Sequence, residues 1–405
     1  MITSYSSEKR DPFEAGCEIG EALSDSDFTL LFANYNYDLR KLLGGFRSRS
    51  NSTVTGCSSS YSLCDGNLVE YGVSAIGTNS KNLVSGSAAA SLSGNFHDVG
   101  VELAERALED LGAPEKKEKL ARIFARYSAI VSSVPERVLL SKPYFYGLMF
   151  LDPLTMADEE VLSGIRSRMN LSAPVSGGDS FGNVAEWRSY QILNEVYENS
   201  AVFNVVATDK SIGLGCGSGF EIVSGEPYVV TKASGRRVYE INYTRAVDIY
   251  SGITGIGIEE LKKERFLAYR IGVKFPFVVV GFDGGRWMKY PVLINGDGSI
   301  TFGTITNTGS VLFRAKADKE QILKSAETSI KSAIAQVDEP RALLVFDCWY
   351  RLAALGEDYG SEAKVIKNCI GSIPMAGFYT MGEILSLSGF MGHRNGSIVA
   401  VALGD

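Results

Sequence analysis

The stretches Leu343-Leu-Val-Phe-Asp-Cys-Trp-Tyr-Arg351 and Ile373-Pro-Met-Ala-Gly-Phe-Tyr-Thr-Met-Gly-Glu-Ile384 decide the fold of the second half of this chain. Each one contains a short, continuous apolar run, which is typical of a strand covered on both faces. A helical pattern around 361–370 separates the two runs, and a third apolar run follows at 397–403. Strands that alternate with a helix in this way predict an α/β arrangement.

The same alternation extends toward the N-terminus. Asp27-Phe-Thr-Leu-Leu-Phe-Ala reads as a buried strand, and apolar positions at helical spacing follow Asp98, Asp158 and Asp318, the last with Gln321 in the capping-box position. The runs 68–76 and 83–92 are interpreted as neighbouring strands of an antiparallel ladder. No short-period repeat is evident. The predicted fold class is α/β with α+β character, in which two domains of mixed β-sheets are covered by amphipathic helices.

The length of 405 residues exceeds that of one ordinary domain. We expect an N-terminal lead-in over residues 1–26, a first domain over 27–222 and a second domain over 223–405. The restart of strand and helix patterns after residue 226 sets the division between the two domains.

Charge and composition disfavour several classes of protein. Forty basic against 47 acidic residues give a net charge of -7, the wrong sign for a phosphate backbone, so nucleic acid is not an expected partner. The N-terminus lacks an apolar signal segment and no run of about 18 apolar residues occurs, which predicts no membrane insertion and a cytoplasmic location. Six scattered cysteines and two histidines favour reduced thiols and no metal centre.

The motifs of common catalytic sites are missing. The chain has neither G-x-x-x-x-G-K-[ST] nor a G-x-S-x-G elbow, so we expect no enzyme. One alternative stays open, a cysteine-dependent hydrolase in which Cys57 or Cys348 pairs with His393, although a buried structural cysteine is the simpler explanation of either thiol. His393, followed by Arg394, is interpreted as a surface-turn residue.

Several stretches together resemble the FIST family (F-box and intracellular signal transduction), with an N-terminal FIST domain and its C-terminal partner. Val345-Phe-Asp-Cys-Trp-Tyr-Arg and Ile373-Pro-Met-Ala-Gly-Phe-Tyr-Thr-Met-Gly-Glu-Ile match its F-x-C-x-x-R and P-x-x-G-F-Y-x-x-G-E-I pair in spacing and order. Thr55-Gly-Cys-Ser-Ser and Ser176-Gly-Gly-Asp match in the first half. The matches span residues 27 to 404 in colinear order.

This resemblance implies a sensory protein that binds a small ligand, such as an amino acid or a related metabolite, and that signals through a separate partner protein. We expect no resident cofactor. Some members of the family resemble haem sensors that use a histidine, and in this chain only His393 stands close to the matching position. A haem-binding gas sensor is therefore the second alternative.

The candidate ligand-binding residues lie in the matched segments. Glycines allow backbone N–H groups to approach an anion, an arginine can clamp a carboxylate, and a carboxylate can pair with an ammonium group. We expect these groups to converge in a single hollow that solvent can reach. The predicted set is Cys57, Ser58, Ser59, Gly177, Gly178, Asp179, Cys348, Arg351, Tyr379 and Glu383, with no catalytic and no metal-binding residue.

Overall fold

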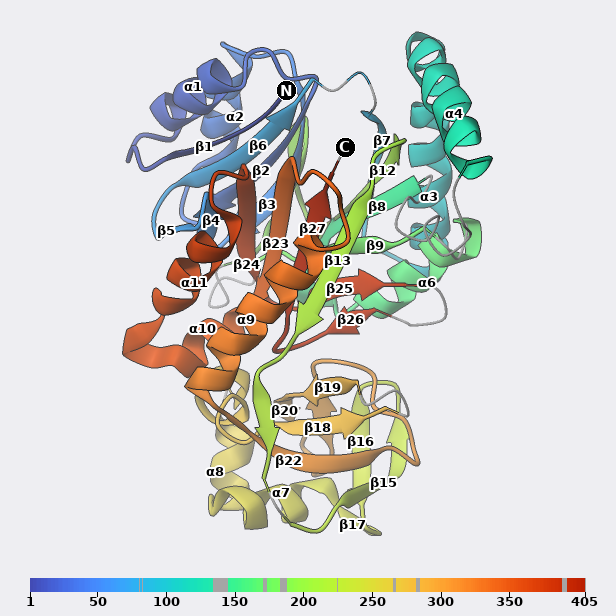
Figure 1. Ribbon diagram of the computed structural model, residues 1–405. Coiled ribbons are helices and arrows are strands. Elements are labelled where there is room, and N and C mark those ends of the chain that lie inside the picture. Colours follow the sequence, from blue (N-terminus) through green and yellow to red (C-terminus); the bar gives the residue numbers. More distant parts are fainter. Residues whose placement is uncertain are drawn as a thin grey trace.

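A computed structural model describes residues 1–79, 81, 83–133, 145–169, 173–182, 188–223, 225–264, 267–281, 285–387 and 392–404. Its helices and mixed sheets confirm the predicted α/β class. Figure 1 shows the larger body of the molecule above a smaller unit that contains α7, α8 and strands β15 to β22.

Three successive segments of the body share one order of elements, and we call them repeats 1, 2 and 3. Each contains a strand, a helix, a second strand, a helix, a third strand, a hairpin and a closing strand. Repeat 1 comprises β1 (Ile2–Ser7), α1 (Pro12–Ala22), β2 (Phe28–Asn34), α2 (Leu39–Arg47), β3 (Thr53–Ser59), β4 (Ser62–Cys64), β5 (Asn67–Val69) and β6 (Val73–Thr78).

Repeats 2 and 3 follow the same plan with additional elements. Repeat 2 comprises β7 (Leu83–Ser91), α3 (Phe96–Leu111), α4 (Lys117–Val131), β8 (Phe145–Leu151), α6 (Asp158–Arg168), β9 (Val175–Asp179), β10 (Tyr190–Leu193), β11 (Glu195–Glu198) and β12 (Ser200–Thr208). Repeat 3 comprises β13 (Ile212–Gly217), α9 (Lys319–Ile334), β23 (Ala342–Cys348), α10 (Trp349–Leu355), α11 (Ser361–Ile370), β24 (Met375–Thr380), β25 (Glu383–Ser386), β26 (His393–Arg394) and β27 (Ile398–Leu403).

The strand pairing is the same in all three repeats. The second and third strands are parallel, the second strand also pairs antiparallel with the closing strand, and the closing strand pairs antiparallel with the first. The predicted ladder between 68–76 and 83–92 is wrong, because β6 belongs to the sheet of repeat 1 and β7 to the sheet of repeat 2. The short connection between them crosses from one sheet to the next.

The hairpins are exchanged between the repeats in a cycle. Strand β4 of repeat 1 pairs with β24 of repeat 3, β25 of repeat 3 pairs with β9 of repeat 2, and β10 of repeat 2 pairs with β3 of repeat 1. Each sheet is therefore completed by a hairpin that comes from another repeat.

One glycine recurs at the same place in each third strand. Gly56, Gly177 and Gly377 are the register partners of Leu31, Met149 and Val345 in the second strands. A Cβ atom on any of them would lie 1.9 to 2.2 Å from the carbonyl oxygen of that partner. Any larger residue would force the parallel strands apart.

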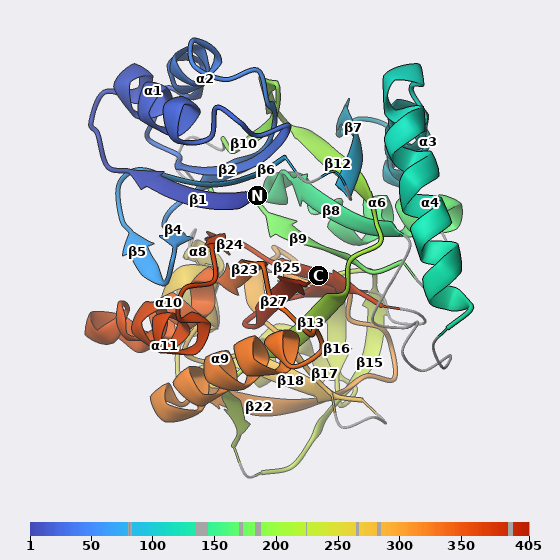
Figure 2. The same cartoon turned by 45° about the horizontal axis from the view of Figure 1, so that its top comes forward.

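The inner faces of the three sheets share one apolar core. Its centre holds Phe32, Phe150 and Phe346, which occupy equivalent positions in β2, β8 and β23, and Phe378 stacks on Phe32 at 4.7 Å between ring centroids. The outer face of each sheet packs on its own helices, α1 and α2, α3 and α6, or α9 and α11. Figure 2 shows these helical groups on three sides of the central strands.

The smaller unit, residues 220–317, is an insertion between β13 and α9 of repeat 3. It comprises β14 (Phe220–Ile222), β15 (Tyr228–Ser234), β16 (Arg237–Ile241), β17 (Thr244–Arg245), α7 (Ala246–Thr254), α8 (Ile258–Lys263), a π-helical turn (Ala268–Gly272), β18 (Phe277–Val280), β19 (Arg286–Lys289), β20 (Pro291–Ile294), β21 (Ile300–Phe302) and β22 (Val311–Ala317). It has its own apolar core around Phe277 and Phe302. Phe220 pairs with Ala317, so the two connections to the body lie side by side.

Residues 1–26 form β1 and α1 of repeat 1. The predicted boundary between residues 222 and 223 lies at the start of the inserted unit, while sheets of the body draw strands from both sides of it. The division into two domains at this point stays a prediction. None of the helices in the described ranges combines the length and the apolar character that a bilayer crossing requires.

Candidate functional site

The sequence-predicted site residues lie at one end of the body, where the second and third strands of the repeats finish. Cys57, Ser58 and Ser59 end β3, Asp179 ends β9 and Cys348 ends β23. The pairing of β25 with β9 brings Glu383 opposite Gly178. The structure thus gathers residues that are far apart in the sequence, and all ten of them are buried.

The hydroxyl and thiol groups of this set contact the protein itself. Ser58 Oγ donates to the carbonyl oxygen of Phe181 at 2.7 Å, and Ser59 Oγ to that of Tyr379 at 3.2 Å. Burial raises the pKa of the Cys57 thiol, and burial together with Glu383 raises the pKa of Cys348, each well above the usual range. Neutral, buried thiols are poor nucleophiles, so this geometry does not favour a cysteine-dependent hydrolase.

The carboxylate of Glu383 also accepts hydrogen bonds from neighbouring residues of the protein. Thr380 Oγ1 donates to one carboxylate oxygen at 2.6 Å, and the backbone N–H and the hydroxyl of Ser397 donate to the other at 2.9 and 2.7 Å. Burial raises the pKa of this carboxyl group, and these hydrogen bonds oppose the shift. They tie the exchanged hairpin to β24 and to the start of β27.

Arg351 forms a buried ion-pair network on α10. Its Nε donates to Asp347 at 2.9 Å, and its other nitrogens reach Glu362, the Ser325 hydroxyl at 3.0 Å and the carbonyl oxygen of Ile322 at 3.0 Å. Burial and Glu362 raise the pKa of Asp347, while Arg351 opposes that rise. The guanidinium group therefore joins α10 to α9 and α11, and its binding of a ligand stays a prediction.

A cleft lies directly beyond Arg351, and we call it the hinge cleft. Its volume is about 580 Å³, and it lies between α9, the end of β13 and the strands β14 and β19. Both covalent connections of the inserted unit pass next to it, through Gly217–Gly219 and through Ala317 to α9. None of the ten sequence-predicted residues, all of which the structure describes, is among those that line it.

The lining of the hinge cleft is polar and carries both signs of charge. Lys324 of α9 and Arg286 of β19 supply two cations, and Glu221 of β14 supplies a carboxylate. Hydroxyl groups of Ser325, Thr328 and Ser329 and the side chain of Gln321 complete the α9 wall. Because Gln321 lies in the first turn of α9, the positive end of the helix dipole adds to the attraction for an anion.

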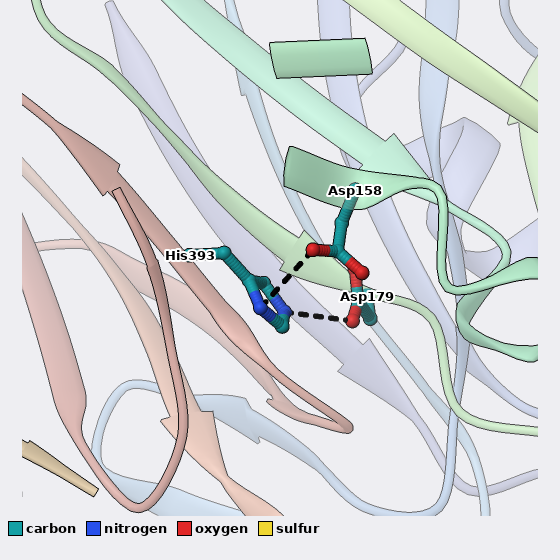
Figure 3. Close-up of side chains that lie close together, drawn as sticks. All are labelled: Asp158, Asp179 and His393. Carbon is teal, nitrogen blue, oxygen red and sulfur yellow. Dashed lines mark hydrogen bonds and ion pairs between the residues drawn. The ribbon is translucent and has the colours of Figure 1, made fainter. Parts of the chain in front are cut away.

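A second contact between the inserted unit and the body is a buried group of charges, which we call the charged latch. It contains Asp158, Asp179 and His393 from the body and Arg236 from the inserted unit. Figure 3 shows the imidazole ring of His393 facing the two carboxylates, with Nδ1 3.1 Å from Asp158 and Nε2 3.0 Å from Asp179. Arg236 contacts Asp158 at 2.5 Å and Glu159 at 3.4 Å.

Burial and neighbouring charges in the latch shift the pKa values of His393 and Asp179. Burial alone would lower the pKa of His393, but Asp158 and Asp179 raise it to about 9. Burial raises the pKa of Asp179 to about 6, against the opposing effect of His393. The interpretation of His393 as a surface-turn residue is wrong, because β26 places it in the interior next to two carboxylates.

The latch could in principle hold a metal ion through Asp158, Asp179 and His393, whose ligand atoms lie within 4.8 Å of one another. The guanidinium group of Arg236 already neutralises Asp158, however, and Nε2 of the imidazole ring is hydrogen-bonded to Asp179, whereas Nδ1 lies 3.1 Å from Asp158 without forming a hydrogen bond. Haem ligation through Nε2 would require this nitrogen to leave Asp179, and ligation through Nδ1 would require Asp158, 3.1 Å away, to move aside. The residues present therefore fit an internal ion-pair cluster better than a metal or haem site.

Sequence reasoning missed both the hinge cleft and the latch. Arg236, Lys324 and Arg286 belong to no recognisable motif, and only the three-dimensional course of the inserted unit brings Arg236 and Arg286 against the body. The predicted start of a helix at Asp158 is correct, since this is the first residue of α6. The sequence carries no signal for its second role as a partner of His393.

Comparison with known proteins places the chain in a family. The model of the FIST N domain matches residues 27–244, and the model of the FIST C domain matches residues 246–386. FIST domains are sensory domains of signal-transduction proteins. A search of curated proteins found no match.

Among solved structures, a cyanuric acid hydrolase from A. caulinodans is similar over 99% of both chains, with 8% sequence identity and a TM-score of 0.32. At this level the likeness says nothing about activity. The two family models cover most of the chain in the order that the sequence motifs predict. The chain therefore belongs to the FIST family.

Proposed function

We propose that this protein is a sensor that binds a small zwitterion or anion, such as an amino acid, in the hinge cleft. Its occupancy would change the position of the inserted unit relative to the body, and a separate signalling protein would read that change. The observation that carries this proposal is the location of the cleft at the two connections of the inserted unit. A ligand that contacts both the inserted unit and the body stabilises the relative orientation in which it binds both.

The chemistry of the lining supports a ligand of this class. Lys324 and Arg286 can hold a carboxylate through charge-assisted hydrogen bonds, and Glu221, whose carboxylate also lies 3.6 Å from Lys316 Nζ, can accept from an ammonium group. The volume of about 580 Å³ lies within the range of small-molecule sites, which commonly occur between domains. The walls come from different elements, so a ligand would be enclosed only while the inserted unit stays close to α9.

A thermal-shift screen with the twenty amino acids and with dicarboxylates tests this proposal. A ligand at about 100 times its dissociation constant should add roughly 2.7 kcal/mol to the free energy of unfolding. Lys324→Ala and Arg286→Ala should each weaken binding at least about tenfold, because each removes a charge-assisted contact. Lys331→Ala is the matched control, since Lys331 lies on the same helix but pairs with Glu327 outside the cleft.

Cys216 offers an independent measurement, because it is exposed and lines the cleft. A bound ligand should slow its alkylation by a maleimide, followed by mass spectrometry, while the half-buried Cys369 keeps its rate. If no compound stabilises the folded protein, or if a stabilising compound leaves Cys216 alkylation and the Lys324→Ala affinity unchanged, the hinge cleft is not the ligand site.

A further inference from the structure

The inserted unit covers the end of the body at which several of the predicted site residues lie. The apolar cluster that joins the two parts contains two buried residues of the body, Cys348 and Tyr350. Tyr290 of the inserted unit stacks on Tyr350 at 3.9 Å between ring centroids. Since the unit also has a separate core of its own, this limited apolar contact permits motion of the unit relative to the body.

The polar contacts of the same interface are centred on the charged latch. Beside the ion pairs of Arg236, the backbone N–H of Ile305 in the inserted unit donates to Glu159 of the body at 2.8 Å. The guanidinium group of Arg394 in the body lies 5.6 Å from the ring centroid of Trp287 in the unit. Buried ion pairs add little net stability, because the loss of hydration offsets most of their attraction.

Four polar side-chain atoms at this interface are buried and lack a hydrogen-bond partner within the described part of the chain. They are Asp179 Oδ1, His393 Nδ1 and Asn395 Oδ1 of the body and the Tyr290 hydroxyl of the inserted unit. A Cβ atom on Gly303 of the unit would lie 2.6 Å from Asn395 Oδ1, and one on Gly396 of the body would lie 2.6 Å from the Tyr290 hydroxyl. These two atoms therefore face the opposite part of the molecule.

The unpartnered atoms oppose the closed arrangement. Buried polar atoms without a partner are rare in folded proteins, because each one has lost its hydration without compensation. Separation of the unit from the body would return these atoms to water. The two covalent connections of the unit lie side by side, so the unit can rotate about them while the sheets of the body stay intact.

We infer that the inserted unit is a hinged lid, which rotates about its two connections, breaks the contacts of Arg236 with the body and exposes Cys348 and Asp179 to solvent only when it is open. The sequence analysis expects both residues in a hollow that solvent can reach, and both are buried in the closed arrangement. Opening requires no ligand. The inference is therefore tested on the ligand-free protein, and it stands or fails separately from the ligand proposed for the hinge cleft.

The rate at which a maleimide alkylates Cys348, followed by mass spectrometry, measures the open state. Cys64 is the internal reference, because it is buried in β4, which pairs with β24 inside the body, and it becomes accessible only when the body unfolds. In the wild type, Cys348 should react at least about tenfold faster than Cys64, since local opening needs less free energy than unfolding. Equal rates at the two thiols would overturn the inference.

Arg236→Gln tests the latch. This variant removes the cation that Asp158 and Glu159 contact from the inserted unit, so Cys348 should react at least about tenfold faster than in the wild type, while the rate at Cys64 stays the same. Arg237→Gln is the matched control, because this neighbouring guanidinium group forms its ion pair within the unit and is 41% exposed. An equal effect of both variants on Cys348 would show that the latch does not hold the lid.

Tyr290→Phe tests the unpartnered hydroxyl and acts in the opposite direction. Loss of a buried hydroxyl group that has no partner should stabilise the closed state and slow the alkylation of Cys348 severalfold. Tyr250→Phe is the control, since its hydroxyl donates to the carbonyl oxygen of Phe275 at 3.4 Å within the core of the unit, and it should leave the rate unchanged. An unchanged or faster reaction of Cys348 in Tyr290→Phe would refute the lid.

Discussion

His393 is buried in the charged latch, and its imidazole ring lies next to the carboxylates of Asp158 and Asp179. Its pKa of about 9 in the folded protein exceeds the ordinary value of 6.5. The folded state therefore binds the proton more tightly than the unfolded state. The resulting stabilisation is fully present below about pH 6.5 and is lost as the pH rises toward 9.

We predict that the difference in the free energy of unfolding between the wild type and His393→Gln shrinks from pH 6.5 to pH 9, measured by urea denaturation. The neighbouring Lys289, whose pKa burial lowers to about 8, adds stability above pH 8 in both proteins, so the difference removes its effect. The loss of His393 would also raise the pKa of Asp179 above its wild-type value of about 6, so the two proteins are compared in an Asp179→Asn background, in which Asp158 still raises the pKa of His393. A difference that stays constant with pH would show that His393 is neutral in the folded protein.

Gly177 offers a second test at the scale of one residue. Its φ is +139°, and a Cβ atom at this position would lie 2.0 Å from the Met149 carbonyl oxygen, which leaves no room for alanine. We predict that Gly177→Ala lowers the free energy of unfolding by on the order of 3 kcal/mol or more. Gly252→Ala in α7, where nothing lies within 4 Å, should instead stabilise the protein by up to about 1 kcal/mol.

At the scale of the element, α9 joins the hinge cleft to the Arg351 network. It begins after Asp318, whose carboxylate accepts from the backbone N–H of Gln321 at 2.9 Å. The sequence predicts this cap, and the structure confirms it. The same helix supplies the wall of the hinge cleft and two of the groups that hold Arg351.

We predict that Asp318→Ala costs about 1 kcal/mol of stability, as expected for the loss of an N-cap, and weakens ligand binding in the hinge cleft. Fraying of the first turn would move Gln321 and lower the positive potential there. Asp38→Ala, which removes the equivalent cap of α2, should cost a similar free energy but leave ligand binding unchanged. Equal binding by both variants would mean that the helix start does not contribute to the site.

Individual elements were predictable from the sequence because they depend on local patterns. The apolar run from Asp27 predicts β2, and Asn295-Gly-Asp-Gly predicts the hairpin between β20 and β21. The pairing of Glu383 with Gly178 was not predictable, since an exchanged hairpin pairs with a strand far away in the chain. Both residues nevertheless lie in segments that match the family's motifs, and the structure places these segments side by side.

At the scale of the whole molecule, the three repeats were hidden in the sequence by their unequal lengths. Repeat 2 carries α4 between its first helix and its second strand, and repeat 3 carries the entire inserted unit between its first strand and its first helix. What the repeats share is a glycine facing a carbonyl group and a central phenylalanine, positions such as Gly56 and Phe32. Two residue types at wide and irregular spacing give no detectable period.

The cyclic exchange of hairpins predicts that the body unfolds as one cooperative unit. Loss of any repeat removes a strand from a neighbouring sheet and exposes part of the shared core. Native-state hydrogen exchange should therefore give equal opening free energies for the amides of β2, β8 and β23. A repeat that exchanges through a separate, lower-energy opening would contradict this prediction.

The same exchange also fixes how many copies of the unit the architecture can hold. A polypeptide shortened by one repeat would leave one sheet edge bare and one hairpin without a strand to join, and a fourth copy could not enter without breaking the closed cycle. Duplication of an ancestral segment would thus yield a sealed product only once the last copy exchanges its hairpin with the first, as happens here with three, and that segment on its own could complete the ring as a trimer of identical chains.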